Sequence, residues 1–169
     1  NNMNKTIIVS NRLPLQISIS DNELNVTPSV GGLATGMKSV HAEGNGVWVG
    51  WSGITDEELD DELKPKVNEK IEASKCRAVS LTEDDVNDFY LGFSNRTLWP
   101  LFHYFLEYTE FENSHWEAYK RVNEKFAKVV LETIEDGDTV WVHDYQLLLL
   151  PQLIKDVKPD VTIGFFLHI

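Results

Sequence analysis

The chain has 169 residues, of which 42% are hydrophobic and 25% are charged. This composition is typical of a globular domain with one sizeable core, and it excludes a disordered, collagen-like or disulfide-stapled chain. The 27 acidic residues outnumber the 15 basic ones and give a formal net charge of −12, so we expect the surface to repel nucleic acids and anionic lipids.

The first forty residues predict a strand, a hairpin and a glycine turn. Residues 6–10 form a β-branched run without polar alternation, which is typical of a parallel strand covered on both faces. Apolar and polar residues alternate over 17–26, which predicts a small hairpin that lies as a flap near the end of the sheet. The pair Gly31-Gly32 then leads into a predicted helix over 33–40.

Four later apolar runs predict further strands, and helix signals separate most of them. These runs are residues 47–49, 76–81, 139–142 and 161–167. Capping boxes that begin at Thr55, Thr82 and Ser114 predict three helix starts. Apolar residues recur at helical spacing from Trp116 to Val130, and a last helix is expected over 151–157.

The order of these elements predicts the fold class. Short apolar strands that alternate with helices indicate an α/β protein with a doubly wound, mostly parallel, Rossmann-like sheet. The chain contains no internal repeat, low-complexity segment or linker, so we expect residues 1–169 to form one domain. In such a sheet the ligand binds outside the carboxyl ends of the strands. Polar residues that follow the strands therefore carry the functional information.

Ionisable residues follow three of the predicted strands. Arg12 follows the first, His143 and Asp144 follow the fourth, and His168 follows the fifth. Each alone would be an ordinary surface residue, but their convergence at one edge of a parallel sheet indicates a shared site. The turn at Gly31-Gly32 suits an anion at a helix start, although it also fits a purely structural turn.

The sequence gives little support for a metal site, a disulfide or a membrane span. The five histidines and the single cysteine, Cys76, lack metal-ligand spacing, so no metal is expected. One cysteine forms no internal disulfide, and no apolar run approaches the ~20 residues of a membrane span. We therefore expect a cytoplasmic protein without membrane or nucleic-acid partners. The aromatic-rich stretch from Trp48 to Trp99 is either core packing or a sugar-stacking wall.

Several motifs occur in a fixed order along the chain. They are residues 8–14 (IVSNRLP), 31–34 (GGLA), 48–53 (WVGWSG), 90–95 (YLGFSN), 98–104 (LWPLFHY), 141–147 (WVHDYQL) and 163–169 (IGFFLHI). Together they resemble the trehalose-6-phosphate synthases, a family of retaining glucosyltransferases with the two-lobed GT-B architecture. The resemblance covers essentially the whole chain.

The resemblance implies a reaction. The family transfers glucose from UDP-glucose to glucose 6-phosphate and forms α,α-trehalose 6-phosphate and UDP with retention of configuration. It implies no cofactor and no metal, two small-molecule substrates as partners, and an oligomeric state that stays open. It also implies that this chain is the N-terminal lobe alone, since the second lobe, which binds uridine and the diphosphate, has no counterpart before Ile169.

The resemblance also implies site residues. Arg12, Tyr90 and Trp99 would hold the phosphate and the ring of the acceptor. The donor diphosphate would lie at the turn formed by Gly31 and Gly32.

Further residues would touch the sugars. Asp144 would bridge the donor and acceptor sugars, His168 would contact the transferred glucose, and Trp51 would contribute to substrate binding. The residues expected to act in catalysis are Arg12, Asp144 and His168.

Two alternative functions stay open. One is a sister transferase with another phosphorylated acceptor, such as glycerol 3-phosphate, and Tyr90 and Trp99 favour a hexose phosphate over it. The other is a catalytically silent regulatory relative, which the presence of all the expected site residues disfavours. A dinucleotide-dependent oxidoreductase would fit the fold class, but the sequence lacks G-x-G-x-x-G.

Overall fold

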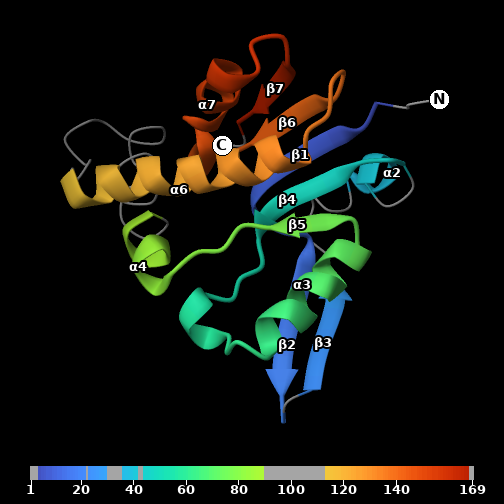
Figure 1. Cartoon of the computed structure of the whole chain (residues 1–169), viewed down its shortest axis with the longest axis vertical. Helices are drawn as coiled ribbons and strands as arrows, with labels where there is room; N and C mark the ends of the chain where they lie inside the picture. The colour runs from blue at the N-terminus through green and yellow to red at the C-terminus, as the bar shows by residue number, and fades with distance from the viewer. Residues whose placement is uncertain (1–3, 22, 30–35, 42–43, 90–112, 168–169) are drawn as a thin grey trace.

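A five-stranded parallel sheet forms the centre of the molecule (Figure 1). The computed structural model describes residues 4–21, 23–29, 36–41, 44–89 and 113–167. The strands of this sheet are β1 (Thr6–Arg12), β4 (Val47–Trp51), β5 (Cys76–Ala78), β6 (Thr139–His143) and β7 (Thr162–Phe166). Each coincides with a predicted apolar run, which confirms the predicted fold class.

The strand order is β5-β4-β1-β6-β7. The chain builds β1, β4 and β5 outward in one direction, then returns across β1 and adds β6 and β7 on the other side. Ile7 of β1 accordingly pairs with Val47 on one edge and Val140 on the other. The strand order reverses between β1 and β6, so the carboxyl ends of these two strands form the topological switch point, where such folds bind ligands.

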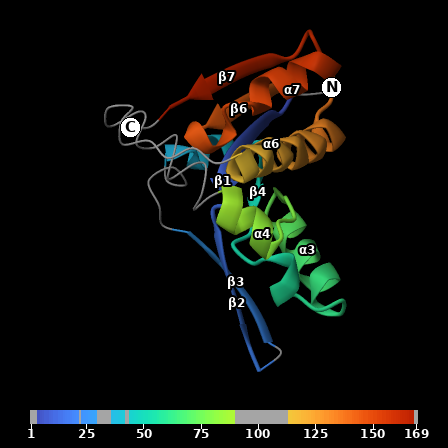
Figure 2. The same cartoon turned by 90° about the vertical axis from the view of Figure 1, so that its left-hand side faces the viewer.

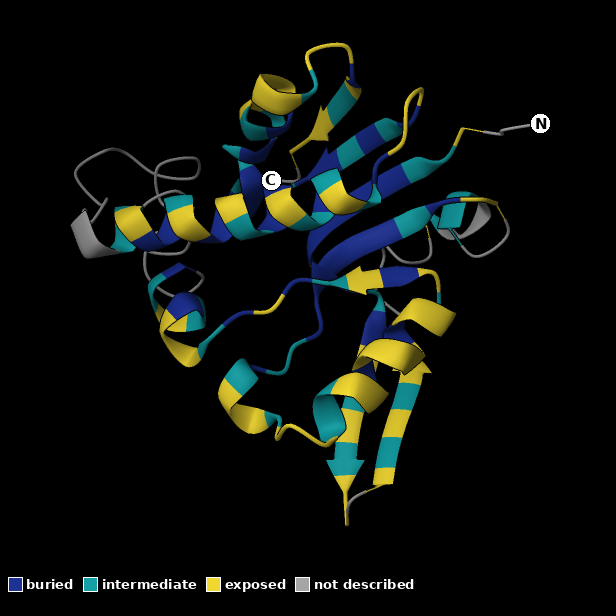
Figure 3. Cartoon of the chain, viewed as in Figure 1, coloured by how far each residue is buried: buried dark blue, intermediate teal, exposed yellow. Residues whose placement is uncertain are grey.

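Helices cover both faces of the sheet. Ile7 and Val9 of β1 pack in a large core that includes residues of α6 and α7, whereas Ile8 faces a smaller core with residues of α3. Figure 3 shows that β1 and β4 are buried over most of their length. The helical elements are α2 (Lys38–His41), η1 (Asp56–Glu58), α3 (Leu63–Ala73), α4 (Glu83–Asp85), α6 (Asn113–Thr133), η4 (Tyr145–Leu147) and α7 (Leu150–Val157).

Helix α6 matches its predicted apolar stripe. Tyr119, Val122, Phe126 and Val130 recur at helical spacing, and all four are buried in the large core. The predicted start at Ser114 is wrong, because α6 already includes Asn113 and Ser114, the first two residues described in this part of the chain.

The other two capping boxes have different outcomes. At α4 the Asp85 N–H donates to the Thr82 hydroxyl and the Thr82 N–H donates to the Asp85 carboxylate, each over 3.1 Å, as predicted. At Thr55 the chain forms only the short 3₁₀ turn η1, in which the Thr55 N–H and the Thr55 hydroxyl both donate to the Glu58 carboxylate, over 3.2 Å and 2.9 Å. This box therefore begins a single turn instead of a full helix.

The predicted hairpin forms a sheet of its own. Its strands β2 (Leu15–Ser20) and β3 (Glu23–Pro28) pair with Ile17 opposite Val26. The hairpin extends away from the parallel sheet in both views (Figure 2). Since β2 begins three residues after Arg12, the hairpin leaves from the carboxyl end of β1. Of the helix predicted over 33–40, the described residues contain only the short α2.

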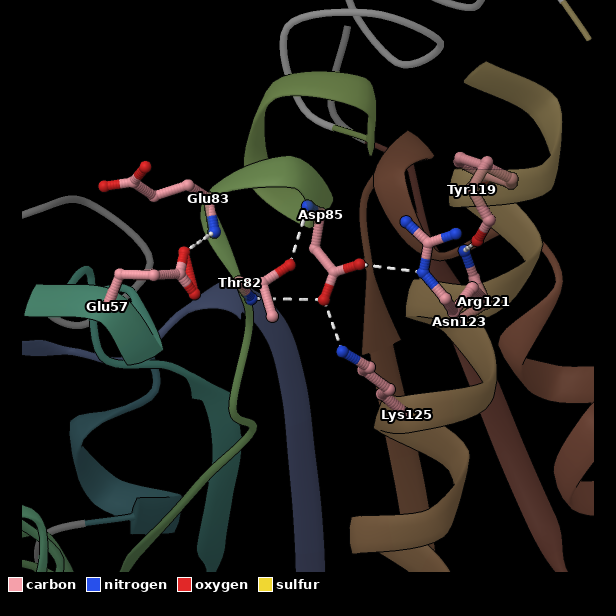
Figure 4. A network of polar contacts seen from close by, with 8 residues as sticks. All are labelled: Glu57, Thr82, Glu83, Asp85, Tyr119, Arg121, Asn123 and Lys125. Atoms are coloured by element: carbon pink, nitrogen blue, oxygen red, sulfur yellow. Dashed lines mark hydrogen bonds and ion pairs between the residues drawn. The ribbon is translucent and has the colours of Figure 1, made fainter. Parts of the chain in front are cut away.

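An ion-pair network around the buried Asp85 joins α4 to α6 (Figure 4). Asp85 of α4 is 1% exposed. One carboxylate oxygen accepts from Arg121 Nε over 2.8 Å, and the other accepts from Lys125 Nζ and from the Thr82 N–H. The chain between α4 and α6 carries Tyr90 and Trp99. The network thus fixes the elements that precede and follow these two residues.

Two acidic residues make folding sensitive to acid. Burial opposes ionisation of Asp85, but its hydrogen bonds from Lys125, the Thr82 N–H and Arg121 outweigh burial and lower the pKa of its carboxyl. Burial likewise opposes ionisation of Asp138, and its bonds from Lys5 and the Glu135 N–H again lower the pKa. A carboxyl whose pKa is lower in the folded state stabilises the protein above its unfolded pKa, near 3.9. This stabilisation is lost as the pH falls through the folded pKa.

We predict that Asp85→Asn lowers the free energy of unfolding at pH 7 by about 1.5–3 kcal/mol, because it weakens hydrogen bonds to charged partners. Urea unfolding measured from pH 7 down to pH 2 should also show a shallower loss of stability below about pH 4 than in the wild type. The control is Asp156→Asn, which changes an exposed carboxylate that bonds only Gln152 among the described residues, and it should cost at most about 0.5 kcal/mol. Equal effects of the two changes would show that the network contributes nothing.

Candidate active site

Three of the predicted site residues lie at the carboxyl edge of the sheet. Arg12 is the last residue of β1, Trp51 is the last residue of β4, and Asp144 directly follows β6. These strands are neighbours in the order β4-β1-β6 and run in parallel, so their ends lie side by side. Of the ionisable residues that we expected to converge, Arg12 and Asp144 thus follow neighbouring strands at one edge, and their role in a shared site stays a prediction.

The end of β1 departs from a regular strand. The prediction placed Arg12 two residues beyond the strand, but β1 continues to Arg12 through an irregularity between Val9 and Arg12. The Ser10 hydroxyl donates to the Arg12 carbonyl over 2.7 Å and accepts from the buried Trp48 Nε1–H over 2.7 Å. These two bonds hold the backbone in its irregular form and set the point from which the Arg12 side chain leaves.

The Arg12 guanidinium lies against Trp51. Its Cζ atom is 5.4 Å from the centroid of the Trp51 ring, which is a cation–π contact. The ring is 8% exposed, and its Nε1–H donates to the Ile54 carbonyl over 3.0 Å. Among the residues that the structure describes, Arg12 has no carboxylate partner. A guanidinium binds phosphate with paired donors.

The Asp144 backbone is strained. Its φ of 78° and ψ of 169° lie in a region that is almost reserved for glycine and costs other residues about 1–3 kcal/mol. The Asp144 N–H donates to the Phe166 carbonyl over 2.7 Å, and the carboxylate accepts from the Tyr145 N–H over 2.8 Å. Such strain persists only where the surroundings impose it, and it gathers at functional sites.

Helix α6 supplies part of this support. The buried Tyr119 hydroxyl donates to the Tyr145 carbonyl over 2.7 Å and accepts from the Leu148 N–H over 3.0 Å. The Asn123 amide donates to the Gln146 carbonyl over 3.2 Å. Burial raises the pKa of the Tyr119 phenol, which stays protonated and keeps its donor. The turn η4 that Asp144 caps is thus fastened to α6.

His143 has a different environment from Asp144. It is the last residue of β6, it is 3% exposed, and its ring stacks on Phe166 with centroids 5.0 Å apart. The His143 side chain is thus buried against Phe166, whereas Asp144, which follows it, is partly exposed.

The remaining site residues, Gly31, Gly32, Tyr90, Trp99 and His168, lie outside the described residues. Their roles stay predictions. Within the described ranges, no group of three or more His, Cys, Asp or Glu side chains could hold a metal ion. None of the helices in these ranges is long and apolar enough to cross a membrane.

Two residues at this edge were not singled out in the sequence. Ser10 shapes the end of β1, as described above, and Gly53 lies against Arg12 with a φ of 92°. Gly53 stands in the WVGWSG motif, which was the one signal that could have drawn attention to it.

Comparison with known proteins identifies relatives along the whole chain. The bifunctional trehalose-6-phosphate synthase/phosphatase of Thermoproteus tenax is 46% identical over 98% of this chain and 23% of its own length. The trehalose-6-phosphate synthase of Mycobacterium avium is 43% identical over 96% of this chain and 33% of its own length. The chain thus spans a third or less of the length of these relatives.

Solved structures give the same result. The UDP-forming α,α-trehalose-phosphate synthase of Burkholderia xenovorans superimposes with a TM-score of 0.74 and 34% identity, over 99% of this chain and 33% of that chain. A structure of a UDP-forming α,α-trehalose-phosphate synthase from Burkholderia xenovorans in complex with glucose 6-phosphate superimposes with a TM-score of 0.69 and 32% identity, over 98% of this chain and 33% of that chain. An Escherichia coli structure bound with UDP-2-fluoro glucose superimposes with a TM-score of 0.72 and 33% identity, over 98% of this chain and 33% of that chain.

The profile of glycosyltransferase family 20 matches residues 4–169. This match agrees with the doubly wound sheet, which corresponds to the N-terminal lobe of GT-B trehalose-phosphate synthases. The chain therefore belongs to glycosyltransferase family 20, together with the UDP-forming trehalose-phosphate synthases.

Proposed function

We propose that this chain is the acceptor-binding lobe of a retaining α,α-trehalose-phosphate synthase. The lobe would bind glucose 6-phosphate and, with a second lobe, transfer glucose to it from UDP-glucose. Structures of relatives in complex with glucose 6-phosphate and with UDP-2-fluoro glucose support both substrates. The chain spans a third or less of the length of the relatives described above.

The position of the Arg12 guanidinium is the observation that carries the proposal. It stands at the switch point of a protein with a net charge of −12 and has no carboxylate partner among the residues that the structure describes. A cation in this position needs an explanation. Binding of a dianionic phosphate would explain it, because charge-assisted hydrogen bonds from a guanidinium are among the strongest hydrogen bonds in proteins. Tyr90 and Trp99 would add a phenol donor and a stacking face for the sugar ring.

Asp144 would orient the two sugars. It follows β6, which pairs with β1, and one oxygen of its carboxylate accepts from the Tyr145 N–H. A carboxylate accepts at both oxygens, so the second can accept from sugar hydroxyls. We assign the donor diphosphate to the turn at Gly31 and Gly32, and contact with the transferred glucose to His168.

The reaction needs no base from this lobe. The bond between the anomeric carbon of glucose and the UDP phosphate oxygen breaks, and a new bond forms on the same face to the anomeric oxygen of glucose 6-phosphate. The departing phosphate takes the proton from that oxygen. The protein would contribute positioning and electrostatic stabilisation of an oxocarbenium-like transition state, without a metal.

We predict that Arg12→Ala in the complete two-lobed protein raises the KM for glucose 6-phosphate at least about tenfold, with little change in the KM for UDP-glucose. Steady-state kinetics with each substrate varied would measure this. The control is Arg77→Ala, which removes an exposed arginine on β5 that pairs with Glu72, and it should leave both constants unchanged. If glycerol 3-phosphate were the better acceptor of the wild type, the sister-transferase alternative would replace the proposal.

We predict that Asp144→Asn lowers kcat more than about tenfold and changes the melting temperature little, because the amide keeps the shape of the side chain but loses its charge. Asp144→Gly should also lose activity, yet melt no lower than Asp144→Asn, because glycine relieves the positive φ. Turnover assays and thermal unfolding of both variants would test this. Strong destabilisation of Asp144→Asn with normal turnover of the folded fraction would make Asp144 structural.

We predict that residues 1–169 produced alone fold but form no trehalose 6-phosphate. The five-stranded sheet has a core on both faces, whereas the basic residues that would neutralise the departing diphosphate are assigned to the second lobe. Loss of a single such donor costs about 3–4 kcal/mol of transition-state stabilisation. Circular dichroism would test whether the chain folds, and a coupled UDP-release assay would test whether it transfers glucose. Measurable product would contradict the two-lobe proposal.

A further inference from the structure

Gly53 lies so close to Arg12 that a side chain on Gly53 would have to displace the guanidinium group. A Cβ atom on Gly53 would stand 2.4 Å from Nη2, 2.7 Å from Cζ and 3.1 Å from Nε of Arg12. The guanidinium group therefore packs on the open α-carbon of Gly53, while its Cζ lies 5.4 Å from the Trp51 ring centroid. These two contacts place the group at the edge of the sheet.

The loop that carries Gly53 is held in place. The Trp51 Nε1–H donates to the Ile54 carbonyl over 3.0 Å, and the Ile54 N–H donates to the buried Ser52 hydroxyl over 3.3 Å. The φ of 92° at Gly53 also belongs to a conformation that other residues rarely adopt. An added side chain at Gly53 would therefore displace the exposed guanidinium of Arg12, because the loop is held more firmly than the guanidinium.

The neighbouring strand ends are equally close. A Cβ atom on Gly50 would stand 2.8 Å from the Ser10 carbonyl oxygen and 3.0 Å from the Leu13 nitrogen. The Leu13 N–H donates to the Trp51 carbonyl over 2.9 Å. The ends of β1 and β4 are therefore locked together, and the base of the Arg12 side chain has little freedom to adapt.

We propose that Gly53 is a positioning residue for acceptor binding: its missing side chain leaves the space in which the Arg12 guanidinium is held toward the acceptor phosphate. The inference rests on the proposed function, in which Arg12 binds that phosphate. It adds a residue that touches no substrate itself and acts only through Arg12.

The test measures Gly53→Ala in the complete two-lobed protein. The added methyl group should displace the guanidinium and raise the KM for glucose 6-phosphate at least about fivefold, with the KM for UDP-glucose and kcat at saturating acceptor within about twofold of wild type. A fall in the amount of folded protein alone would lower the apparent kcat and leave both KM values unchanged. The split between KM and kcat thus separates positioning from a merely structural role.

Gly137→Ala is a matched control. Gly137 has a φ of 89°, and a Cβ atom there would stand 2.7 Å from the side-chain oxygen of Asn4. Both residues precede their strands, β6 and β1, and so lie at the opposite edge of the sheet. This variant carries similar backbone strain and a similar clash, but the KM for glucose 6-phosphate should stay at the wild-type value.

A double mutant shows whether Gly53 acts through Arg12. In the Arg12→Ala background there is no guanidinium to displace, so adding Gly53→Ala should leave the raised acceptor KM unchanged, a non-additive result. Gly53→Asn provides a second variant, because asparagine tolerates a positive φ better than alanine, and it should raise the acceptor KM in the same way.

The possible results separate the inference from the proposed function. If Arg12→Ala raises the acceptor KM but Gly53→Ala behaves like Gly137→Ala, the positioning role of Gly53 is wrong and the proposed function stands. If Gly53→Ala raises the acceptor KM further in the Arg12→Ala background, Gly53 acts independently of Arg12 and the inference is again wrong. If Arg12→Ala has no effect, the assigned acceptor site itself fails. If neither Gly53→Ala nor Gly53→Asn folds, Gly53 is structural and the inference is overturned.

Discussion

Pairing of β1 on both of its edges is the constraint on which the rest of the structure depends. Residues Ile7, Ile8 and Val9 pair with β4 on one side and β6 on the other, and all three are completely buried. A strand in this position needs apolar side chains on both faces and helices to cover them, which α3, α6 and α7 provide. Because the chain must return across β1 to reach β6, the ends of β4, β1 and β6 lie side by side.

The site at this edge depends on local groups more than on the charge of the whole protein. A net charge of −12 disfavours a bound anion at long range. At short range, however, the Arg12 guanidinium lies against the Trp51 ring and has no carboxylate partner among the described residues. Screening limits charge effects between exposed groups to about 8–10 Å, so a few well-placed donors decide whether a phosphate binds.

The same edge contains the strained residue of the site. The Asp144 backbone has a positive φ, and its energetic cost is met by the surrounding contacts of the turn. The Phe166 carbonyl accepts from the Asp144 N–H, while Tyr119 holds the turn η4 from α6. Helix α6 therefore serves both the core and the site. Its apolar stripe covers the sheet, and its polar side chains hold the turn η4, which follows Asp144.

Features set by neighbours in the sequence could be predicted, and features set by distant contacts could not. The apolar runs predicted all five parallel strands, because strands buried on both faces show no polar alternation. The box at Thr82 formed between partners three residues apart, as predicted, although the same spacing at Thr55 began only a 3₁₀ turn. In contrast, β1 extends to Arg12 through bonds that involve Trp48, 38 residues from Ser10. The close approach of Gly53 to Arg12 likewise depends on the pairing of β1 with β4, which no local pattern reveals.

The central claim is that the ends of β1 and β6 form the acceptor site. The most direct test is a crystal structure of the complete two-lobed protein with UDP and glucose 6-phosphate. The account predicts the acceptor phosphate within hydrogen-bond distance of the Arg12 guanidinium and a sugar hydroxyl within hydrogen-bond distance of the Asp144 carboxylate. An acceptor bound elsewhere, with Arg12 exposed to solvent and Asp144 bonded only within its own turn, would contradict it.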